Sequence, residues 1–222
     1  MGASYQQRGN VAVITLDNPP VNGLGYETRR DLSAGVERAL ADAAVAAIVV
    51  TGAGRAFSGG ADIREFGTPK MTAEPSLHTV IQAVEASSKP VVAAVHGVAM
   101  GGGLELALAC DLRVAEEHAQ MALPEATVGL LPCAGGTQWL AWAVGESWAK
   151  RMVLLGERVD AATAARIGLV DEVVPRGGAL QRALAMAAMV EKQSPTSVTA
   201  CKRLIHGWFV HRRVIHRGLV RG

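Results

Sequence analysis

The sequence contains few cysteines. Only Cys110, Cys133 and Cys201 occur in 222 residues, and they lie far apart. An odd number of widely separated cysteines argues against a disulfide framework and against a zinc site, and it is typical of proteins in a reducing compartment. The sequence therefore predicts a cytoplasmic protein with no metal centre.

A strong charge of one sign and long apolar runs are also missing. The formal net charge is +2, which does not indicate a nucleic-acid partner. Lys89, His96 and Glu105 interrupt the apolar runs before they reach the length of a membrane span. The N-terminus has neither an apolar signal region nor an arginine-rich amphipathic stretch, so we expect no targeting signal. Because half of the residues are hydrophobic, the composition favours a soluble globular protein.

Strands and helices are expected to alternate in the first two thirds of the chain. Residues 11–16 form a short apolar run that is typical of a strand, and residues 26–41 carry apolar residues at helical spacing. The other expected elements are strands at 46–51, 90–95, 111–115 and 119–122, and helices within 57–66, at 74–87 and after residue 103. Alternating strands and helices separated by Gly or Pro predict the α/β class.

The last third of the chain is expected to be mostly helical. Helical patterns occur at 139–144, 147–155, 161–167, 179–190 and 197–205. We place a division near residue 175, between a core of residues 1–175 and a helical region of residues 176–222. Residues 206–222 contain four arginines, three histidines and no acidic residue, unlike the rest of the chain. We interpret the sequence after about residue 205 as a truncated or altered continuation.

Two glutamates, Glu105 and Glu125, each follow a turn-forming segment of glycines or proline. Glu105 lies in an apolar run that includes Leu104 and Leu106, where a carboxylate is costly to bury unless it is paired or neutralised. Glu125 taken alone, after Pro124, is better explained as a solvated residue at a strand exit. Together the two carboxylates indicate acid/base catalysis on a small molecule.

Four segments carry a family resemblance. They are residues 57–64 (FSGGADIR), 96–107 (HGVAMGGGLELA), 123–125 (LPE) and 129–138 (GLLPCAGGTQ). Their order, spacing and content resemble the crotonase superfamily, specifically the enoyl-CoA hydratases, over about residues 11–205. This resemblance implies a crotonase-like spiral of ββα units, followed by a helical C-terminal region.

The resemblance also implies a site. Backbone N–H groups of Gly59 and Gly102 would form an oxyanion hole for a thioester oxygen, and glycines allow close approach because they lack a Cβ. Glu105 would act as the general base toward water, and Glu125 as the acid that protonates the substrate. The residues expected to contact substrate and coenzyme A are Gly59, Gly60, Ala61, Asp62, Ile63 and Gly102.

The implied reaction is hydration of a trans-2-enoyl-CoA to a 3-hydroxyacyl-CoA, as in fatty-acid catabolism. It needs neither a metal nor a redox cofactor, since coenzyme A is part of the substrate. The family resemblance further implies a homotrimer or a dimer of trimers. Isomerases of the superfamily generally use a single carboxylate, at the position of Glu125, so the presence of Glu105 favours hydration.

The sequence has three alternative interpretations. The chain could be an enoyl-CoA isomerase or another acyl-CoA enzyme of this fold, or a truncated homologue that binds acyl-CoA without turning it over. A dinucleotide-binding turn at Gly52 and Gly54 is disfavoured because no third glycine follows at the required offset.

A few other side chains carry weaker expectations. The family commonly has glycine at the position of Cys133, which is expected here to be a small buried side chain and not a nucleophile, because no histidine lies nearby in sequence. His96 is expected in the core or in a turn, and His78 faces either an acyl pocket or solvent. Three tryptophans are expected to pack against other elements: Trp139, Trp142 and Trp148.

Overall fold

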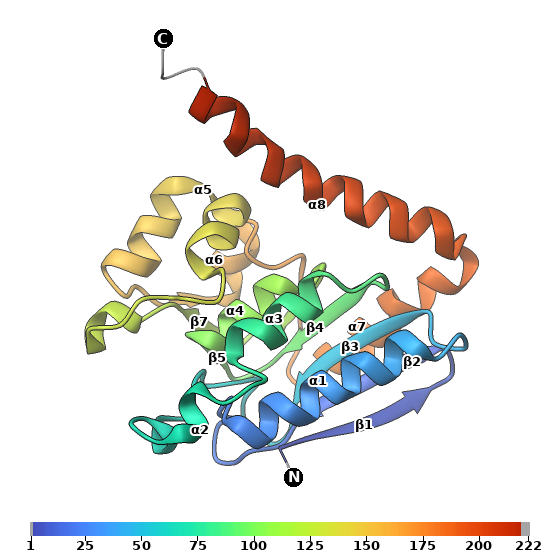
Figure 1. Cartoon of the computed structure of the whole chain (residues 1–222), viewed down its shortest axis with the longest axis horizontal. Coiled ribbons are helices and arrows are strands. Elements are labelled where there is room, and N and C mark those ends of the chain that lie inside the picture. The colour runs from blue at the N-terminus through green and yellow to red at the C-terminus, as the bar shows by residue number, and fades with distance from the viewer. Residues whose placement is uncertain (1, 219–222) are drawn as a thin grey trace.

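The protein is described by a computed structural model that covers the backbone of residues 2–218 and the side chains of residues 2–207. A six-stranded sheet, ordered β1-β2-β3-β4-β6-β9, lies at its centre (Figure 1). β1 is antiparallel to β2, and the other neighbours are parallel. The strands are β1 (Ala3–Arg8), β2 (Val11–Leu16), β3 (Ala47–Gly52), β4 (Val91–Val95), β6 (Leu112–Glu116) and β9 (Glu172–Val174).

Helices cover both faces of this sheet. α1 (Tyr26–Ala41) and α3 (Leu77–Glu85) belong to the layer on one face, and α7 (Ala179–Ala188) packs on the other (Figure 1). The central strands are therefore buried on both sides, which explains why β3 and β4 are continuous apolar runs without alternation. α7 contributes Ala179, Ala183 and Ala187 to the second apolar cluster, and these small side chains allow it to lie close to the sheet.

A second, three-stranded sheet is smaller but positions the candidate site. It is ordered β5-β7-β8, with β5 (Val98–Met100) parallel to β7 (Gln120–Ala122) and β8 (Val159–Asp160) antiparallel to β7. Each of its first two strands runs into a helical element, β5 into α4 (Gly102–Ala109) and β7 into the short helix η2 (Glu125–Val128).

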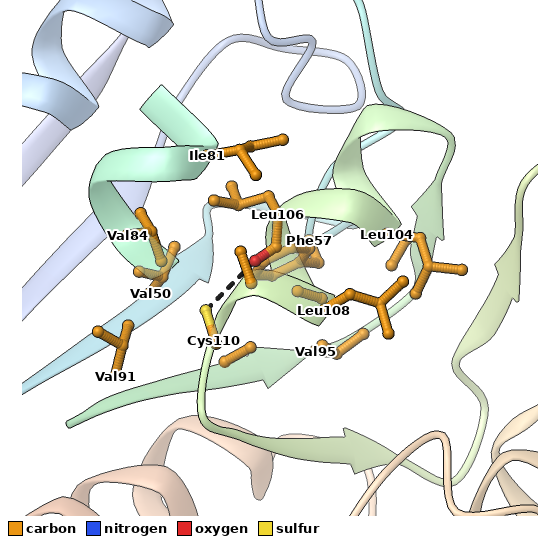
Figure 2. Close-up of a cluster of buried hydrophobic side chains, with 14 of the residues drawn as sticks. Val50, Phe57, Ile81, Val84, Val91, Val95, Leu104, Leu106, Leu108 and Cys110 are labelled. Atoms are coloured by element: carbon orange, nitrogen blue, oxygen red, sulfur yellow. Dashed lines mark hydrogen bonds between the residues drawn. The ribbon is translucent and has the colours of Figure 1, made fainter. Parts of the chain in front are cut away.

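Helix α4 runs through the interior of the protein, and all eight of its residues are buried. Figure 2 shows Leu104, Leu106 and Leu108 among side chains from α3, β3 and β4. At the end of the helix the Cys110 thiol donates a hydrogen bond to the Leu106 carbonyl oxygen at 3.3 Å. A helix that is apolar on every side must be buried, so the one carboxylate on it, Glu105, is removed from bulk water.

The remaining elements surround this core. α5 (Gly136–Leu154) packs on α4 and is kinked at Gly145, whose φ of 77° is not helical. The helix α8 (Pro195–Gly218) extends along one side of the molecule toward the C-terminus (Figure 1). The other elements are the short helices η1 (Ile63–Glu65), α2 (Pro69–Thr72), α6 (Ala161–Arg166) and η3 (Met189–Lys192). None of the described helices combines the length and the apolar character needed to cross a membrane.

The α/β class predicted from the sequence is confirmed, and the helix predicted at 26–41 has the same bounds in the structure. The last third is mostly helical, as expected, and it also supplies the short strands β8 and β9. The helices expected at 139–144 and 147–155 are the two arms of α5 on either side of the kink at Gly145. The unusual segment from residue 206 continues α8 up to Gly218, and residues 219–222 lie outside the described part.

Candidate active site

Two parallel strands bring the two predicted glutamates together. In the small sheet, Met100 at the end of β5 is paired with Ala122 at the end of β7. Just beyond this pair, the Gly101 N–H group donates to the Ala122 carbonyl oxygen at 2.9 Å. Because parallel strands deliver their following segments to the same edge, Glu105 on α4 and Glu125 on η2 lie on adjacent segments.

Glu125 lies directly against the turn into α4. Gly101 has a φ of 52°, and a Cβ added there would lie 3.1 Å from Glu125 Oε1. Glycine is therefore required at this position twice over, by the left-handed backbone and by the close carboxylate. The turn that starts α4 thus has the second carboxylate packed on it.

The Glu105 side chain is held by two backbone donors. The residue is 1% exposed, and its Oε1 accepts hydrogen bonds from Ala134 N–H at 2.8 Å and from Gly136 N–H at 2.9 Å. Burial raises the pKa of Glu105, while the two N–H groups act in the opposite direction by stabilising the charged form. The carboxylate is consequently fixed in position by the backbone at the start of α5.

Glu125 has a different environment. Its Oε2 is buried, and no residue in the described part of the chain offers it a hydrogen bond. Burial, with a smaller contribution from the negative charge of Glu105, raises the pKa of Glu125 to about 7. Near neutral pH, Glu125 is therefore protonated in a substantial fraction of molecules, whereas Glu105 has donors that favour its charge. Two carboxylates with different surroundings are the usual arrangement for separate acid and base roles.

Gly59 does not offer the N–H group that the sequence assigned to it. Its N–H donates to the Val21 carbonyl oxygen at 2.6 Å, so it is not free to meet a substrate oxygen, and this part of the prediction is wrong. The next free donor along the chain is Ala61 N–H, which has no acceptor among the described residues. A Cβ added to Gly102 would lie 3.7 Å from Ala61 N, so these two backbone donors are close together.

Gly102 fits its predicted position. It is the first residue of α4, so its N–H has no partner within the helix, and the partial positive charge of the helix N-terminus is located there. Gly60 packs against the same helix start: its φ is 94°, and an added Cβ would lie 2.7 Å from Met100 O and 3.2 Å from Gly102 N. A side chain at residue 60 would push the two donor segments apart.

The rest of the predicted coenzyme-binding segment is at the surface. Asp62 accepts hydrogen bonds from the Arg64 backbone and guanidinium and from Asn18. The contact with Arg64 is the main reason why the pKa of Asp62 falls to about 2. Ile63 is 77% exposed. The segment is therefore accessible to a ligand that approaches Ala61 from solvent.

The structure also places Cys133, His96 and His78, for which the expectations from the sequence were weaker. Cys133 is exposed, so the expectation that it is buried is wrong; partial desolvation and the charges of Glu105 and Glu125 raise its thiol pKa. His96 is a turn histidine whose ring contacts the Gly54 carbonyl oxygen at 3.2 Å, and burial lowers its pKa. His78 is exposed on α3.

The tryptophans and the potential metal ligands add no further chemistry. Trp139 and Trp148 pack against the main apolar cluster, as predicted. Trp142 is partly buried in the same helix. Within the residues that the structure describes, no three His, Cys, Asp or Glu side chains gather in a way that could hold a metal ion.

Sequence reasoning missed the two donors that hold Glu105. Ala134 and Gly136 belong to the segment 129–138 that carries part of the family resemblance, so the sequence already indicated that this segment lies near the site. What the sequence could not show is that the N–H groups point at Glu105. Gly136 is also the position where a side chain would collide with that carboxylate, since an added Cβ would lie 2.9 Å from Glu105 Oε1.

Comparisons with known proteins identify the family and the fold. The family model for enoyl-CoA hydratase/isomerase matches residues 6–213. The 2,3-dehydroadipyl-CoA hydratase of Escherichia coli is 40% identical over 208 residues, and the match covers 91% of this chain and 80% of the relative. A solved structure of DspI from Pseudomonas aeruginosa has a TM-score of 0.87 and 44% identity, and the match covers 100% of this chain and 89% of that chain.

The match to longer relatives is partial. The peroxisomal bifunctional enzyme of Danio rerio is 49% identical over 164 residues, or 74% of this chain. These residues make up 23% of the relative, so the chain spans about a quarter of the length of the bifunctional proteins that it matches.

Proposed function

The chain belongs to the enoyl-CoA hydratase/isomerase (crotonase) family of acyl-CoA enzymes, and from that premise we propose that it adds water to the double bond of a trans-2-enoyl-CoA. The observation that carries this proposal is the pairing of two partly or fully buried carboxylates, Glu105 and Glu125, beside the free N–H groups of Ala61 and Gly102. Each group has a task in the hydration of a conjugated thioester.

The free backbone donors act on the thioester oxygen. Attack of water at C3 moves negative charge through the conjugated system onto this oxygen. Ala61 N–H and Gly102 N–H stabilise the resulting enolate, and the N-terminus of α4 adds its partial positive charge. Loss of one donor of this kind costs about 3–4 kcal/mol of transition-state stabilisation.

The carboxylates move the protons. Glu105, held by Ala134 and Gly136, takes a proton from the water whose oxygen bonds to C3. Glu125, with its raised pKa, gives a proton to C2. The product carries the elements of one water molecule, and a proton returns from Glu105 to Glu125 through solvent before the next turnover. General acid and base catalysis of this kind contributes about 10²- to 10⁴-fold each.

The coenzyme is proposed to lie along the segment from Gly59 to Ile63. This segment contains the Ala61 donor and ends in the surface side chains of Asp62 and Ile63. A thioester bound at Ala61 would therefore extend its coenzyme toward solvent. The proposed mechanism calls for no metal or redox group. Water supplies the electron pair of the new C–O bond, and the product gains only the elements of one water molecule.

We also propose that the protein assembles as a homotrimer or a dimer of trimers. Large apolar side chains are exposed next to the site, at and just after the ends of η2 and α5: Val128, Leu130, Leu131, Leu154 and Leu155. The two segments are adjacent, since a Cβ added to Gly156 would lie 3.1 Å from the Thr127 side chain. Exposed apolar groups of this extent favour burial against another surface. Light scattering would test the assembly, and a monomer would contradict it.

The acyl group of the substrate, the location of the protein and its domain division are proposals for this chain. The relatives include a 2,3-dehydroadipyl-CoA hydratase and peroxisomal bifunctional enzymes, and we propose that the substrate of this chain is likewise the CoA thioester of a fatty or related acid. A cytoplasmic location and a functional division near residue 175 are likewise proposals.

Hydration and isomerisation can be separated by the product. Purified protein would be incubated with a trans-2-enoyl-CoA and, separately, with a 3-enoyl-CoA. Gain of water would be followed by mass, and isomerisation, which leaves the mass unchanged, by the absorbance of the conjugated 2-enoyl thioester. We expect the 2-enoyl thioester to gain one water. Conversion of the 3-enoyl thioester to its isomer, without any gain of water from the 2-enoyl thioester, would favour the isomerase alternative. Binding without turnover of either would favour a non-catalytic acyl-CoA-binding protein.

A further inference from the structure

A buried arginine lies behind the candidate oxyanion hole. Arg29 on α1 is 5% exposed, and its guanidinium group lies inside the protein. Burial of a guanidinium is costly unless its five N–H groups find acceptors. An arginine kept in such a place therefore has partners whose positions it determines.

Those partners are backbone carbonyl oxygens of the segment that follows the site. Nε of Arg29 donates to Pro75 O at 2.9 Å, and Nη2 donates to Lys70 O at 2.6 Å. Glu65 lies 3.5 Å from Nη1 and accepts the Tyr26 N–H with both carboxylate oxygens. The guanidinium thus fastens η1, α2 and the start of α3 to the N-terminus of α1.

A further hydrogen bond connects Arg29 to the site itself. Nη1 donates to Leu24 O at 3.0 Å, and Leu24 N–H donates to Gly60 O at 2.8 Å. Gly60 C=O and Ala61 N–H belong to one planar peptide unit, in which the two bonds point in opposite directions. A donor that fixes the Gly60 oxygen therefore fixes the direction in which Ala61 N–H points. It also polarises that N–H group, because hydrogen bonds in series strengthen one another.

We propose that Arg29 is a positioning residue that aims the Ala61 N–H group at the thioester oxygen, through Leu24 and the Gly60–Ala61 peptide. This inference rests on the proposed role of Ala61. Arg29 touches neither substrate nor the reacting carboxylates. It acts by holding Leu24 from one side and the segment 63–75 from the other, so that the peptide between them cannot rotate.

The test compares three variants. Arg29→Lys keeps the charge but cannot reach all the carbonyl oxygens, and Arg29→Met keeps the apolar stem without donors. Arg30→Met is the matched control, because Arg30 is the next residue of α1 and its exposed guanidinium pairs with Glu27 and Asp31, away from the site. The kinetic measurement is kcat for hydration of crotonyl-CoA. Binding of butyryl-CoA, a saturated thioester, measures ground-state affinity.

A spectroscopic measurement reports on the hole directly. The coenzyme A thioester of a dimethylamino-substituted cinnamic acid absorbs at longer wavelength when its carbonyl is polarised, so the red shift at saturation measures the oxyanion donors in each bound molecule. We expect Arg29→Lys to lose about tenfold in kcat and a clear part of the red shift, and Arg29→Met to lose more, since a misplacement of about 1 Å can cost about 10²-fold. Butyryl-CoA affinity should change by less than about threefold, because the ground state makes weaker demands on the hole.

Each outcome decides between the claims. If the Arg29 variants match Arg30→Met in kcat and red shift, the positioning role is wrong even though the enzyme hydrates its substrate. If the wild-type protein does not hydrate crotonyl-CoA, but the red shift of the bound thioester is smaller in Arg29→Lys than in the wild type, the proposed function is wrong and the positioning role stands. Should Arg29→Met fail to fold, Arg29→Lys carries the test, because the red shift is measured only on protein that has bound the thioester.

Discussion

Replacement of Gly136 by alanine should misplace the general base without removing any of its hydrogen-bond donors. The added Cβ would lie 2.9 Å from both Cγ and Oε1 of Glu105, whereas ordinary contacts begin at 3.4 Å. The carboxylate must therefore move by 3.4 − 2.9 = 0.5 Å. Since a misplacement of about 1 Å can cost about 10²-fold, half of it should lower kcat about tenfold.

The same movement should change the pH dependence. In the wild-type protein, the hydrogen bonds from Ala134 N–H and Gly136 N–H oppose the rise in the pKa of Glu105. The movement lengthens these bonds, so the pKa of Glu105 should rise further in the variant. The acid limb of the rate profile should therefore move to higher pH. Overpacking of this contact should also cost about 1–3 kcal/mol of stability.

The assay is hydration of crotonyl-CoA across the pH range, together with thermal unfolding. Gly207→Ala is the matched control, because an added Cβ there meets nothing within 4 Å. The control should keep the wild-type rate and profile. A folded Gly136→Ala protein with a kcat within about twofold of wild type and an unmoved acid limb would refute the assigned role of this contact.

The titrating groups Glu125 and Cys133 give three other predictions. Hydration should decline as the pH rises through about 7, because Glu125 then loses the proton that it gives to C2; a rate that increases through this range would contradict its role as the acid. Glu125 should also weaken the native state at higher pH: its pKa is raised in the folded protein from 4.5 to about 7, so its contribution to stability is complete below 4.5 and is lost as the pH rises through 7. Glu125→Gln should therefore gain thermal stability over wild type at pH well above 7 and not at pH below 4.5, which paired melting curves would show. Cys133→Ser should keep kcat within about twofold, because a thiol with a raised pKa is a poor nucleophile and takes no part in the proton transfers; a loss of more than about tenfold would give the thiol a role.

The sequence predicts the buried framework well because apolar periodicity reports burial directly. α1 was predicted with its observed bounds from residues 26–41, and Glu105 was expected inside an apolar helix, where it lies. The elements that were missed are polar or very short. β1 reads ASYQQR and has only its first residue buried, and β8 has two residues. Such strands are specified by their neighbours in the sheet and not by their own composition.

The orientation of backbone groups could not be predicted in the same way. Gly59 and Ala61 are two residues apart in one glycine-rich turn, and either N–H could have been the oxyanion donor. The choice is made by Val21, whose carbonyl oxygen accepts the Gly59 N–H from a distant part of the sequence. The exposure of Cys133 is of the same kind, because it depends on the path of a loop whose alternate residues, Pro132 and Ala134, are buried.

The measurement that tests the central claim most directly is the loss of conjugated enoyl-thioester absorbance with crotonyl-CoA, for the wild-type protein, Glu105→Gln and Glu125→Gln. Each substitution keeps the size of the side chain and removes its ability to exchange a proton. The account predicts hydration by the wild type and a loss of at least about 10²-fold in each variant. A wild-type protein that binds crotonyl-CoA without hydrating it, or a variant that retains the wild-type rate, would contradict the proposal that Glu105 and Glu125 carry the reaction.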